Sequence, residues 1–420
     1  MKKPISRLVS AAAALFALVL SALAFCPIAS AGELTQGRLS PRNHVLLERL
    51  LEESGRRGPG GDDRRRPYIV CDWDNTSAFG DAAETLTWYM ADNLAYPFSV
   101  AGFRRAVSLN VPKGASKLAN DDGKPVVFDD LVEDLVEDYA FLHASYKGLG
   151  GTRSLEEVKA TEEFRDFVAK LFVLFDALDA TVGTARADQW QGQLMTGIGS
   201  EQLSELSERS IRKNLGAEIR KIRLSSSETL QRRCKRVSST TSQGLRVYPE
   251  MGSLYQALME AGVDVFIVSA SPEEIIVPFA CKKEYGYGIP RDHVFGARFA
   301  KAGGILQPEL SPERAMTWGP GKVELIRKLL VPRAGQPPLL VCGDSDGDFD
   351  MFTAFPQTRL GFIVNRLKKG SIGTVCQEAV RQLGERRPRY VLQGIDENTG
   401  LFDADEATVK FGTTEKVLIR

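Results

Sequence analysis

Three short runs of apolar residues end abruptly in acidic or hydroxyl side chains. They cover residues 67–72, 263–268 and 338–342, and the polar residues at or just after their ends are Asp72, Ser269 and Asp344. Mainly apolar runs of this length are typical of strands buried on both faces of a parallel sheet. Because ligands of open α/β sheets bind at the carboxyl ends of the strands, these polar residues are candidates for one common site.

Before the second run, and again before the third, apolar residues recur at helical spacing. Pro249 opens one such stretch and Gly262 closes it, and a further helix is expected from about Lys322 to Leu330. Residues 271–274, Ser-Pro-Glu-Glu, predict another helix start, with Ser271 as N-cap and a capping-box glutamate. Alternating helices and buried strands predict an α/β fold with a doubly wound parallel sheet.

A long helix-like region separates the first apolar run from the second. Its stretches at 128–144, 154–180 and 201–223 predict a helical domain inserted into the α/β core, with bounds at residues 81–243. The Ser/Thr-rich segment 238–242 at its exit predicts a flexible hinge.

The amino terminus has the pattern of an export signal. Basic residues within the first seven positions precede an apolar run over residues 8–25, and Ala29 and Ala31 supply the small residues of a cleavage site. We expect residues 1–31 to be removed and the mature protein to be periplasmic or secreted, without stable membrane insertion. The alternative is an uncleaved anchor, because the run is near the length that spans a bilayer.

Residues 32–66 are expected to form a short helix and a linker. The helix is predicted over residues 39–51, and the Gly/Pro/Arg-rich stretch 55–66 lacks apolar periodicity. The core is then assigned to residues 67–80 and 244–420.

The composition is that of an ordinary globular protein. Among its 420 residues, 54 Lys and Arg balance 54 Asp and Glu, and 43% of residues are hydrophobic, which excludes disordered and collagen-like chains. No basic excess points to a nucleic-acid partner. The histidines are far apart and no CxxC pair occurs, so zinc enzymes and Ser-His-Asp hydrolases have weak support. Five cysteines would remain after cleavage, and their pairing is left open: Cys71, Cys234, Cys281, Cys342 and Cys376.

Asp72 and Asp74 suit hydrolysis of a phosphate monoester. Asp72 can attack phosphorus and form an aspartyl-phosphate, which divides one difficult displacement into two easier ones. Asp74, just beyond the strand end, can protonate the leaving alcohol and later deprotonate water. A solvated turn or a structural cation site is the alternative for this pair.

Other candidate residues would bind phosphate or a metal. Ser269 lies where a strand meets a helix start, and its hydroxyl and the following amides can bind phosphate oxygens. Lys322, a cation in the first turn of a helix, opposes the helix dipole, so neutralising phosphate and Asp72 explains its position better than a solvated surface does. Several carboxylates around an anionic substrate require a cation, and oxygen ligands favour Mg²⁺.

The ordered set of Asp72-Trp-Asp74-Asn-Thr76, Ser269, Lys322 and residues 343–348, Gly-Asp-Ser-Asp-Gly-Asp, resembles the haloacid dehalogenase superfamily, particularly its phosphatases. The resemblance implies a Rossmann-like core, with the insertion as its helical cap. It also implies that Asp72 and Asp344 bind Mg²⁺ through side-chain oxygens and Asp74 through its backbone carbonyl. Asp348 would be a further ligand, directly or through water. Gly347 and Ala270-Ser271 depart from the phosphoserine-phosphatase pattern and put phosphoserine in doubt as the substrate.

Glu84 and Trp88 are candidates for recognising the substrate's head group. They are four residues apart on one predicted helical face, and a carboxylate beside an indole can bind a quaternary ammonium group. The exported location and residues 269–273, Ser-Ala-Ser-Pro-Glu, resemble the phosphorylcholine-phosphatase branch, which implies choline as that group. Trp190 is a candidate third wall. The structural alternative is a Trp88 packed in the core and a solvated Glu84.

These observations predict an exported, Mg²⁺-dependent phosphomonoester hydrolase acting on a small phosphorylated alcohol, with phosphorylcholine as a candidate. Alternatives are a broad-specificity acid phosphatase, a phosphoserine phosphatase and a phosphotransferase, although export argues against a transferase with a cytoplasmic substrate. From another class, a phosphate-ester binding protein without turnover remains.

Overall fold

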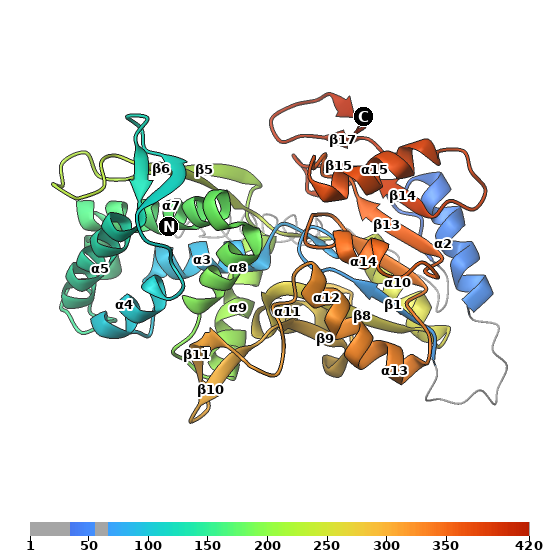
Figure 1. The fold of residues 1–420 in the computed structure, drawn as a ribbon, viewed down its shortest axis with the longest axis horizontal. Coiled ribbons are helices and arrows are strands. Elements are labelled where there is room, and N and C mark those ends of the chain that lie inside the picture. The colour runs from blue at the N-terminus through green and yellow to red at the C-terminus, as the bar shows by residue number, and fades with distance from the viewer. Residues whose placement is uncertain (1–33, 55–65, 420) are drawn as a thin grey trace, which may run out of the picture.

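A six-stranded parallel sheet forms the centre of the core domain (Figure 1). The structure is a computed structural model and describes residues 34–54 and 66–419. The strand order is β14-β13-β12-β1-β8-β9. In chain order the strands are β1 (Tyr68–Cys71), β8 (Asp264–Pro272), β9 (Val294–Ala297), β12 (Leu340–Gly343), β13 (Leu360–Val364) and β14 (Tyr390–Gln393). The predicted export signal, residues 1–31, lies outside the described residues, as does most of the predicted linker.

The register of the parallel strands aligns their carboxyl ends. Cys71, the last residue of β1, pairs with Cys342 of β12 on one side and with Ile267 of β8 on the other. The residues that follow these strands therefore emerge at one edge, and the predicted doubly wound parallel fold is confirmed. Cys71 and Cys342 are fully buried, and all five described cysteines are free thiols.

Alternate residues of each strand face different helical layers, which explains the continuous apolar runs. Ile69 and Cys71 pack in one layer with α2 (Pro41–Ser54), α10 (Pro249–Glu260) and α11 (Glu273–Cys281). Tyr68 and Val70 pack in the opposite layer. The elements of that layer are α12 (Pro320–Leu325), a π-helical turn (Ile326–Leu330), α13 (Val331–Ala334), α14 (Phe349–Thr353) and α15 (Ser371–Arg381). Burial on both faces leaves little room for polar residues within a strand.

Smaller strands flank the core. The tail beyond α15 and β14 folds into a four-stranded sheet of order β16-β15-β17-β18. These strands are β15 (Ile395–Asp396), β16 (Leu401–Phe402), β17 (Thr408–Val409) and β18 (Lys416–Val417). Two short strands, β2 (Ala78–Phe79) and β7 (Arg246–Val247), pair with each other where the chain leaves the core for the insertion and where it returns. Within the described residues, no helix has both the length and the apolar character needed to cross a bilayer.

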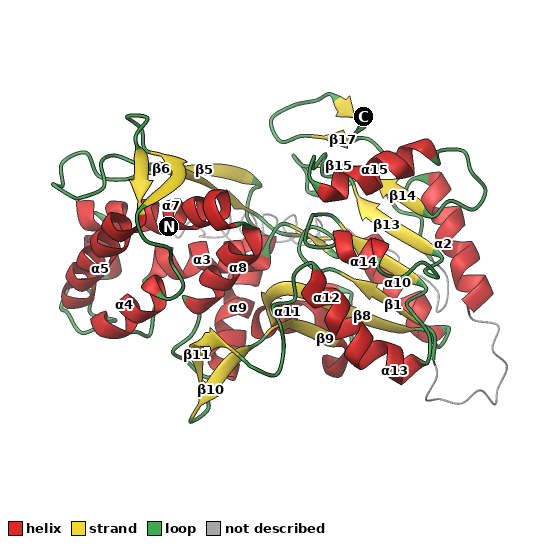
Figure 2. Cartoon of the chain, in the orientation of Figure 1, coloured by secondary structure: helices red, strands yellow, loops and turns green. Residues whose placement is uncertain are grey.

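The inserted region forms a second body with its own hydrophobic core, here called the cap (Figure 2). Its helices are α3 (Ala82–Asn93), α4 (Val100–Ser108), α5 (Phe128–Ser145), α6 (Leu155–Lys159), α7 (Glu162–Val182), α8 (Thr184–Gln193) and α9 (Ser200–Leu215). Its hairpins are β3 (Ala115–Ala119) with β4 (Pro125–Val127), and β5 (Arg220–Ser225) with β6 (Ser238–Gln243). A third hairpin, β10 (Phe299–Ala302) with β11 (Ile305–Leu310), reaches from the core chain and contributes Phe299 and Leu306 to the cap core.

Two predictions about the insertion are wrong. The helix expected over 201–223 ends at Leu215, and β5 begins at Arg220. The hinge expected over 238–242 is the strand β6, which pairs with β5 along six residues. Along β6, buried side chains alternate with exposed or half-buried ones. Small hydroxyl residues suit such a pleated surface with one buried face.

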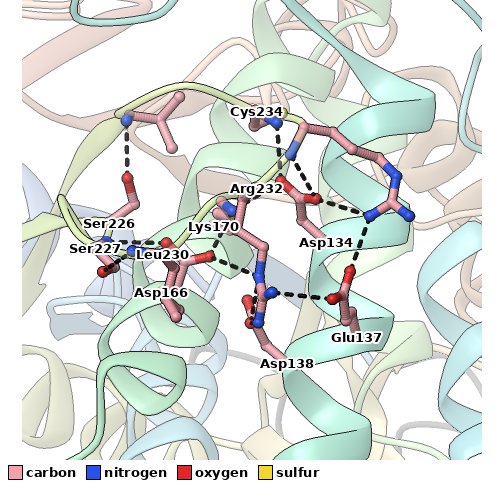
Figure 3. Close-up of polar contacts among 12 residues, drawn as sticks. Asp134, Glu137, Asp138, Asp166, Lys170, Ser226, Ser227, Leu230, Arg232 and Cys234 are labelled. Carbon is pink, nitrogen blue, oxygen red and sulfur yellow. Dashed lines mark hydrogen bonds and ion pairs between the residues drawn. The ribbon is translucent and has the colours of Figure 1, made fainter.

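A buried charge cluster fastens the loop between β5 and β6 to the cap helices (Figure 3). The ammonium group of Lys170, on α7, is buried and bonds to both Asp134 and Asp166. Arg232, on the loop, bonds to Asp138. Asp134 also accepts the backbone N–H groups of residues 233 and 234. Each buried charge thus has an opposite charge beside it, which offsets the cost of removing it from water.

Candidate active site

Three buried carboxylates meet at the carboxyl edge of the central sheet. Asp72 follows β1, Asp344 follows β12, and Asp348 comes from the loop after Asp344. One oxygen of each lies within 4.8 Å of the others. The structure thus brings together three of the predicted metal ligands. The fourth, Asp74, was predicted to bind through its backbone carbonyl, and its carboxylate bonds to Ala82 and Ser271.

Lys322 compensates two of these charges. Its Nζ atom donates to Asp72 Oδ1 at 2.6 Å and to Asp348 Oδ1 at 2.7 Å, and its side chain is only 2% exposed. Burial opposes the charged ammonium, but Asp348 and Asp72 together keep the pKa of Lys322 above its ordinary value. This ion-pair network explains a cation in the first turn of a helix.

Asp348 also shapes the loop that carries Asp344. Its second oxygen, Oδ2, accepts the backbone N–H of Asp344 at 2.9 Å and of Ser345 at 3.1 Å. Gly343 allows this turn, because a Cβ atom there would lie 2.5 Å from the Cβ of Asp348. Both oxygens of Asp348 are therefore engaged by the protein.

Asp74 occupies a different environment from Asp72. Its Oδ1 accepts the N–H of Ala82 at 2.7 Å, and its Oδ2 accepts the Ser271 hydroxyl at 2.6 Å. Burial and the charge of Asp81 raise the pKa of Asp74 to about 8, although the bonds from Ala82 and Ser271 act in the opposite direction. At neutral pH this group is mainly a carboxylic acid, which can donate a proton.

The predicted capping role of Ser271 is wrong. Strand β8 runs through Pro272, and α11 begins at Glu273 without a side-chain cap. The Ser271 hydroxyl donates to Asp74 instead, because the strand carries it to the same edge of the sheet. Ser269 lies farther from the helix start than expected. Its hydroxyl accepts the N–H of Ser271 and is 3.4 Å from Asp74 Oδ2.

Two cations of the site were missed by the sequence reasoning. Arg366 Nη1 donates to Asp344 Oδ2 at 2.8 Å, and Lys368 lines the same cavity. Both follow β13, whose five residues are all buried. The apolar run at 360–364 ending in Asn365-Arg366 carries the same signal as the other strand ends, so it could have been found.

A cavity of about 260 Å³ lies between this edge of the sheet and the cap. The core side supplies the predicted residues Asp72, Asp74, Ser269, Lys322 and Asp344, together with Ser271, Trp318, Arg366 and Lys368. The cap side supplies Glu84, Phe175, Thr184, Asp188 and Gln191. A cluster of core cations and carboxylates thus faces a cap wall with three acids, Asp81, Glu84 and Asp188.

The predicted aromatic receptor is not assembled. Glu84 lines the cavity, but its Oε1 accepts the Thr241 hydroxyl at 2.8 Å and the Ser242 N–H at 2.7 Å. Trp88 lies one turn farther along α3 and packs against Phe172, with ring centroids 6.2 Å apart. Trp88 is absent from the described cavity lining because only the first turn of α3 borders the cavity. Trp190 is also part of the cap core, and its indole N–H donates to a backbone carbonyl.

Residues 169–353 match the family model of haloacid dehalogenase-like hydrolases. The chain carries a haloacid dehalogenase-like hydrolase domain. The matched range contains Ser269, Lys322, Asp344 and Asp348, whereas Asp72 precedes it. The predicted superfamily is confirmed by this match.

Individual proteins are also similar to this chain in sequence or in structure. A phosphorylcholine phosphatase from Pseudomonas aeruginosa is 29% identical over 150 residues, which are 30% of this chain and 42% of that protein. The match thus spans less than half of the curated relative. A conserved, functionally unknown protein from Anaerococcus prevotii DSM 20548 has a similar structure, with a TM-score of 0.81 and 26% identity over 89% of this chain and 97% of that one. A protein of unknown function from Bordetella pertussis Tohama I gives a TM-score of 0.40 at 12% identity over 78% and 98% of the chains.

Proposed function

We propose that this hydrolase cleaves phosphate monoesters of small alcohols, with phosphorylcholine as the favoured substrate. The observation that carries the proposal is the pair of carboxyl groups at the end of β1. Asp72 is bonded to Lys322, and Asp74, two residues later, has a raised pKa and faces the same cavity. A nucleophile next to a proton donor is what the reaction requires.

In the first step, Asp72 is the nucleophile. Lys322 holds Oδ1, while Oδ2 has no hydrogen-bond partner among the described residues. Attack of Oδ2 on phosphorus forms an aspartyl-phosphate and breaks the bond from phosphorus to the alcohol oxygen. Asp74 gives its proton to the departing oxygen, which therefore leaves as the uncharged hydroxyl group of the alcohol.

The second step restores the enzyme. Asp74, now a carboxylate, takes a proton from a water molecule, and the water oxygen attacks phosphorus. The bond between phosphorus and Asp72 breaks, which releases inorganic phosphate and regenerates the Asp72 carboxylate. Ser269 lines the cavity beside Asp74 and can donate its hydroxyl to a phosphoryl oxygen during both steps.

The carboxylate cluster suits Mg²⁺. Its donors are oxygens only, and two protein cations, Lys322 and Arg366, bond to its three buried carboxylates. Asp72 and Asp344 would bind the ion directly. Asp348, the third carboxylate of the cluster, would be a further ligand, directly or through water. When bound, the ion would neutralise negative charge on the carboxylates and on the phosphoryl oxygens.

The proposed place of action is outside the cytoplasm. The basic, apolar and small-residue pattern of residues 1–31 supports export to the periplasm or beyond. The similarity to a phosphorylcholine phosphatase supports the choice of substrate within the proposal.

The test is phosphate release from phosphorylcholine, phosphoethanolamine, phosphoserine and p-nitrophenyl phosphate, with Mg²⁺ or with chelator. We expect Mg²⁺-dependent release, fastest with phosphorylcholine, and no release by Asp72→Asn. Equal rates with all esters would favour a broad-specificity phosphatase. Binding of esters without release, by folded protein containing Mg²⁺, would contradict the hydrolase and favour a binding protein.

A further inference from the structure

Among the described residues, Asp188 is the one carboxylate of the cavity without a hydrogen-bond or ion-pair partner. It lies on α8 of the cap and lines the same cavity as Asp72 and Lys322. Asp74, the proposed proton donor, lines this cavity too.

The other acids of the cavity are all engaged. Asp72 bonds to Lys322 and Asp344 to Arg366. The remaining three accept hydrogen bonds from hydroxyl or backbone groups, and they are Asp74, Asp81 and Glu84. A half-buried carboxylate near other acids is costly unless an opposite charge reaches it. Burial, followed by the charges of Asp81 and Asp179, raises the pKa of Asp188 well above its ordinary value. A cation bound beside Asp188 would lower this pKa and keep the side chain ionised as a carboxylate.

We propose that Asp188 binds the positive charge of the substrate's alcohol, and that the enzyme therefore selects phosphate esters of amino alcohols. This inference rests on the proposed function, because the phosphate end must lie at Asp72 and Lys322. An ester bound there extends its alcohol toward the cap wall, where a positive charge on the alcohol can pair with Asp188. The half-buried ring of Phe175, on the same wall, offers an apolar and π-electron surface for the methyl groups of a quaternary ammonium.

The charge distribution of the cavity supports a cation at this position. Lys322 and Arg366 already bond to core carboxylates at the phosphate end. The cap wall adds Asp188 and Glu84, with no cation among its lining residues. A second anionic group on the alcohol would face these carboxylates and be repelled, whereas an ammonium group would be attracted. Selection for charge thus comes from the cap, and the phosphoryl chemistry comes from the core.

The experiment compares two esters of the same shape. Phosphorylcholine carries an ammonium nitrogen, and dimethylbutyl phosphate has a carbon atom in its place. We expect Asp188→Asn to lower kcat/KM for phosphorylcholine by about tenfold or more. The same substitution should leave kcat/KM for the neutral ester nearly unchanged, because it removes a charge and keeps the side-chain shape.

A matched control comes from Asp122, between β3 and β4 of the cap. It is exposed and does not line the cavity. Asp122→Asn should change neither kcat/KM value by more than about twofold. Asp188→Glu should restore most of the preference for phosphorylcholine. An equal fall in kcat/KM for both esters in Asp188→Asn would overturn the proposal and assign Asp188 a structural or general catalytic role.

Direct binding of choline separates this proposal from the proposed function. Calorimetry with wild-type protein and choline or ethanolamine requires no turnover. We expect binding by the wild type that is weakened by about tenfold or more in Asp188→Asn. Failure of the wild type to bind either amino alcohol, or equal binding by both proteins, would contradict the role of Asp188. Choline binding without phosphate release from any ester would instead contradict the hydrolase.

Discussion

Replacing Lys322 by methionine tests the electrostatic design of the site. The substitution keeps a long apolar side chain of similar size and removes the ammonium group. Lys322 is buried and bonds to Asp72 at 2.6 Å and to Asp348 at 2.7 Å. Two hydrogen bonds to charged groups contribute about 1.5–3 kcal/mol each, which sets an upper range of about 3–6 kcal/mol.

The net loss should be smaller than that range. Two carboxylates left without Lys322 can take up a proton or bind Mg²⁺, which lowers the cost of the missing cation. We expect Lys322→Met to lower the free energy of unfolding by about 3 kcal/mol without Mg²⁺. Added Mg²⁺ should recover part of this loss, because it binds the folded carboxylate cluster better than the unfolded chain.

The assay is urea unfolding of both proteins, followed by tryptophan fluorescence with Mg²⁺ or with chelator. Phosphate release is measured in parallel, and we expect it to fall by about a thousandfold, as for loss of a charge that stabilises the transition state. Lys328→Met is the matched control, since Lys328 forms an exposed pair with Glu324. Unchanged unfolding of Lys322→Met, or retained turnover, would refute the argument that Lys322 balances these carboxylates.

Three further predictions address the cap, the loop and the corrected head-group site. Lys170→Met should lower the free energy of unfolding by about 3–5 kcal/mol, measured in urea, because Asp134 and Asp166 lose their buried cation; an unchanged unfolding midpoint would contradict this. Gly343→Ala should reduce phosphate release by about a hundredfold or more, because its Cβ atom would collide with Asp348 and shift the loop; full activity would show that the loop can move away. Trp88→Phe should leave the preference for phosphorylcholine over dimethylbutyl phosphate unchanged in steady-state kinetics, because Trp88 packs against Phe172; a lost preference would return the indole to the binding site.

Much of the core site could be predicted from the sequence because burial constrains a parallel strand strongly. A strand covered by helices on both faces must be apolar throughout, so its end is visible as a sudden acid or hydroxyl. Asp72 and Asp344 were located in this way, and the sheet register aligns the strands that precede them. The expected capping role of Ser271 shows the limit of such local patterns. Its partner, Asp74, lies 197 residues away, and that contact exists only once β1 and β8 are adjacent.

The head-group wall was decided by tertiary structure alone. Glu84 and Trp88 share a helical face in sequence, yet α3 meets the cavity only with its first turn, so Trp88 packs inside the cap. Asp188 carries no signal of its own in the sequence, because its significance is the lack of a partner. Whether a carboxylate is compensated depends on every group that folding brings near it. The sequence by itself therefore determined the strands and the chemistry at their ends, and the packing of the cap decided which charge remains for a ligand.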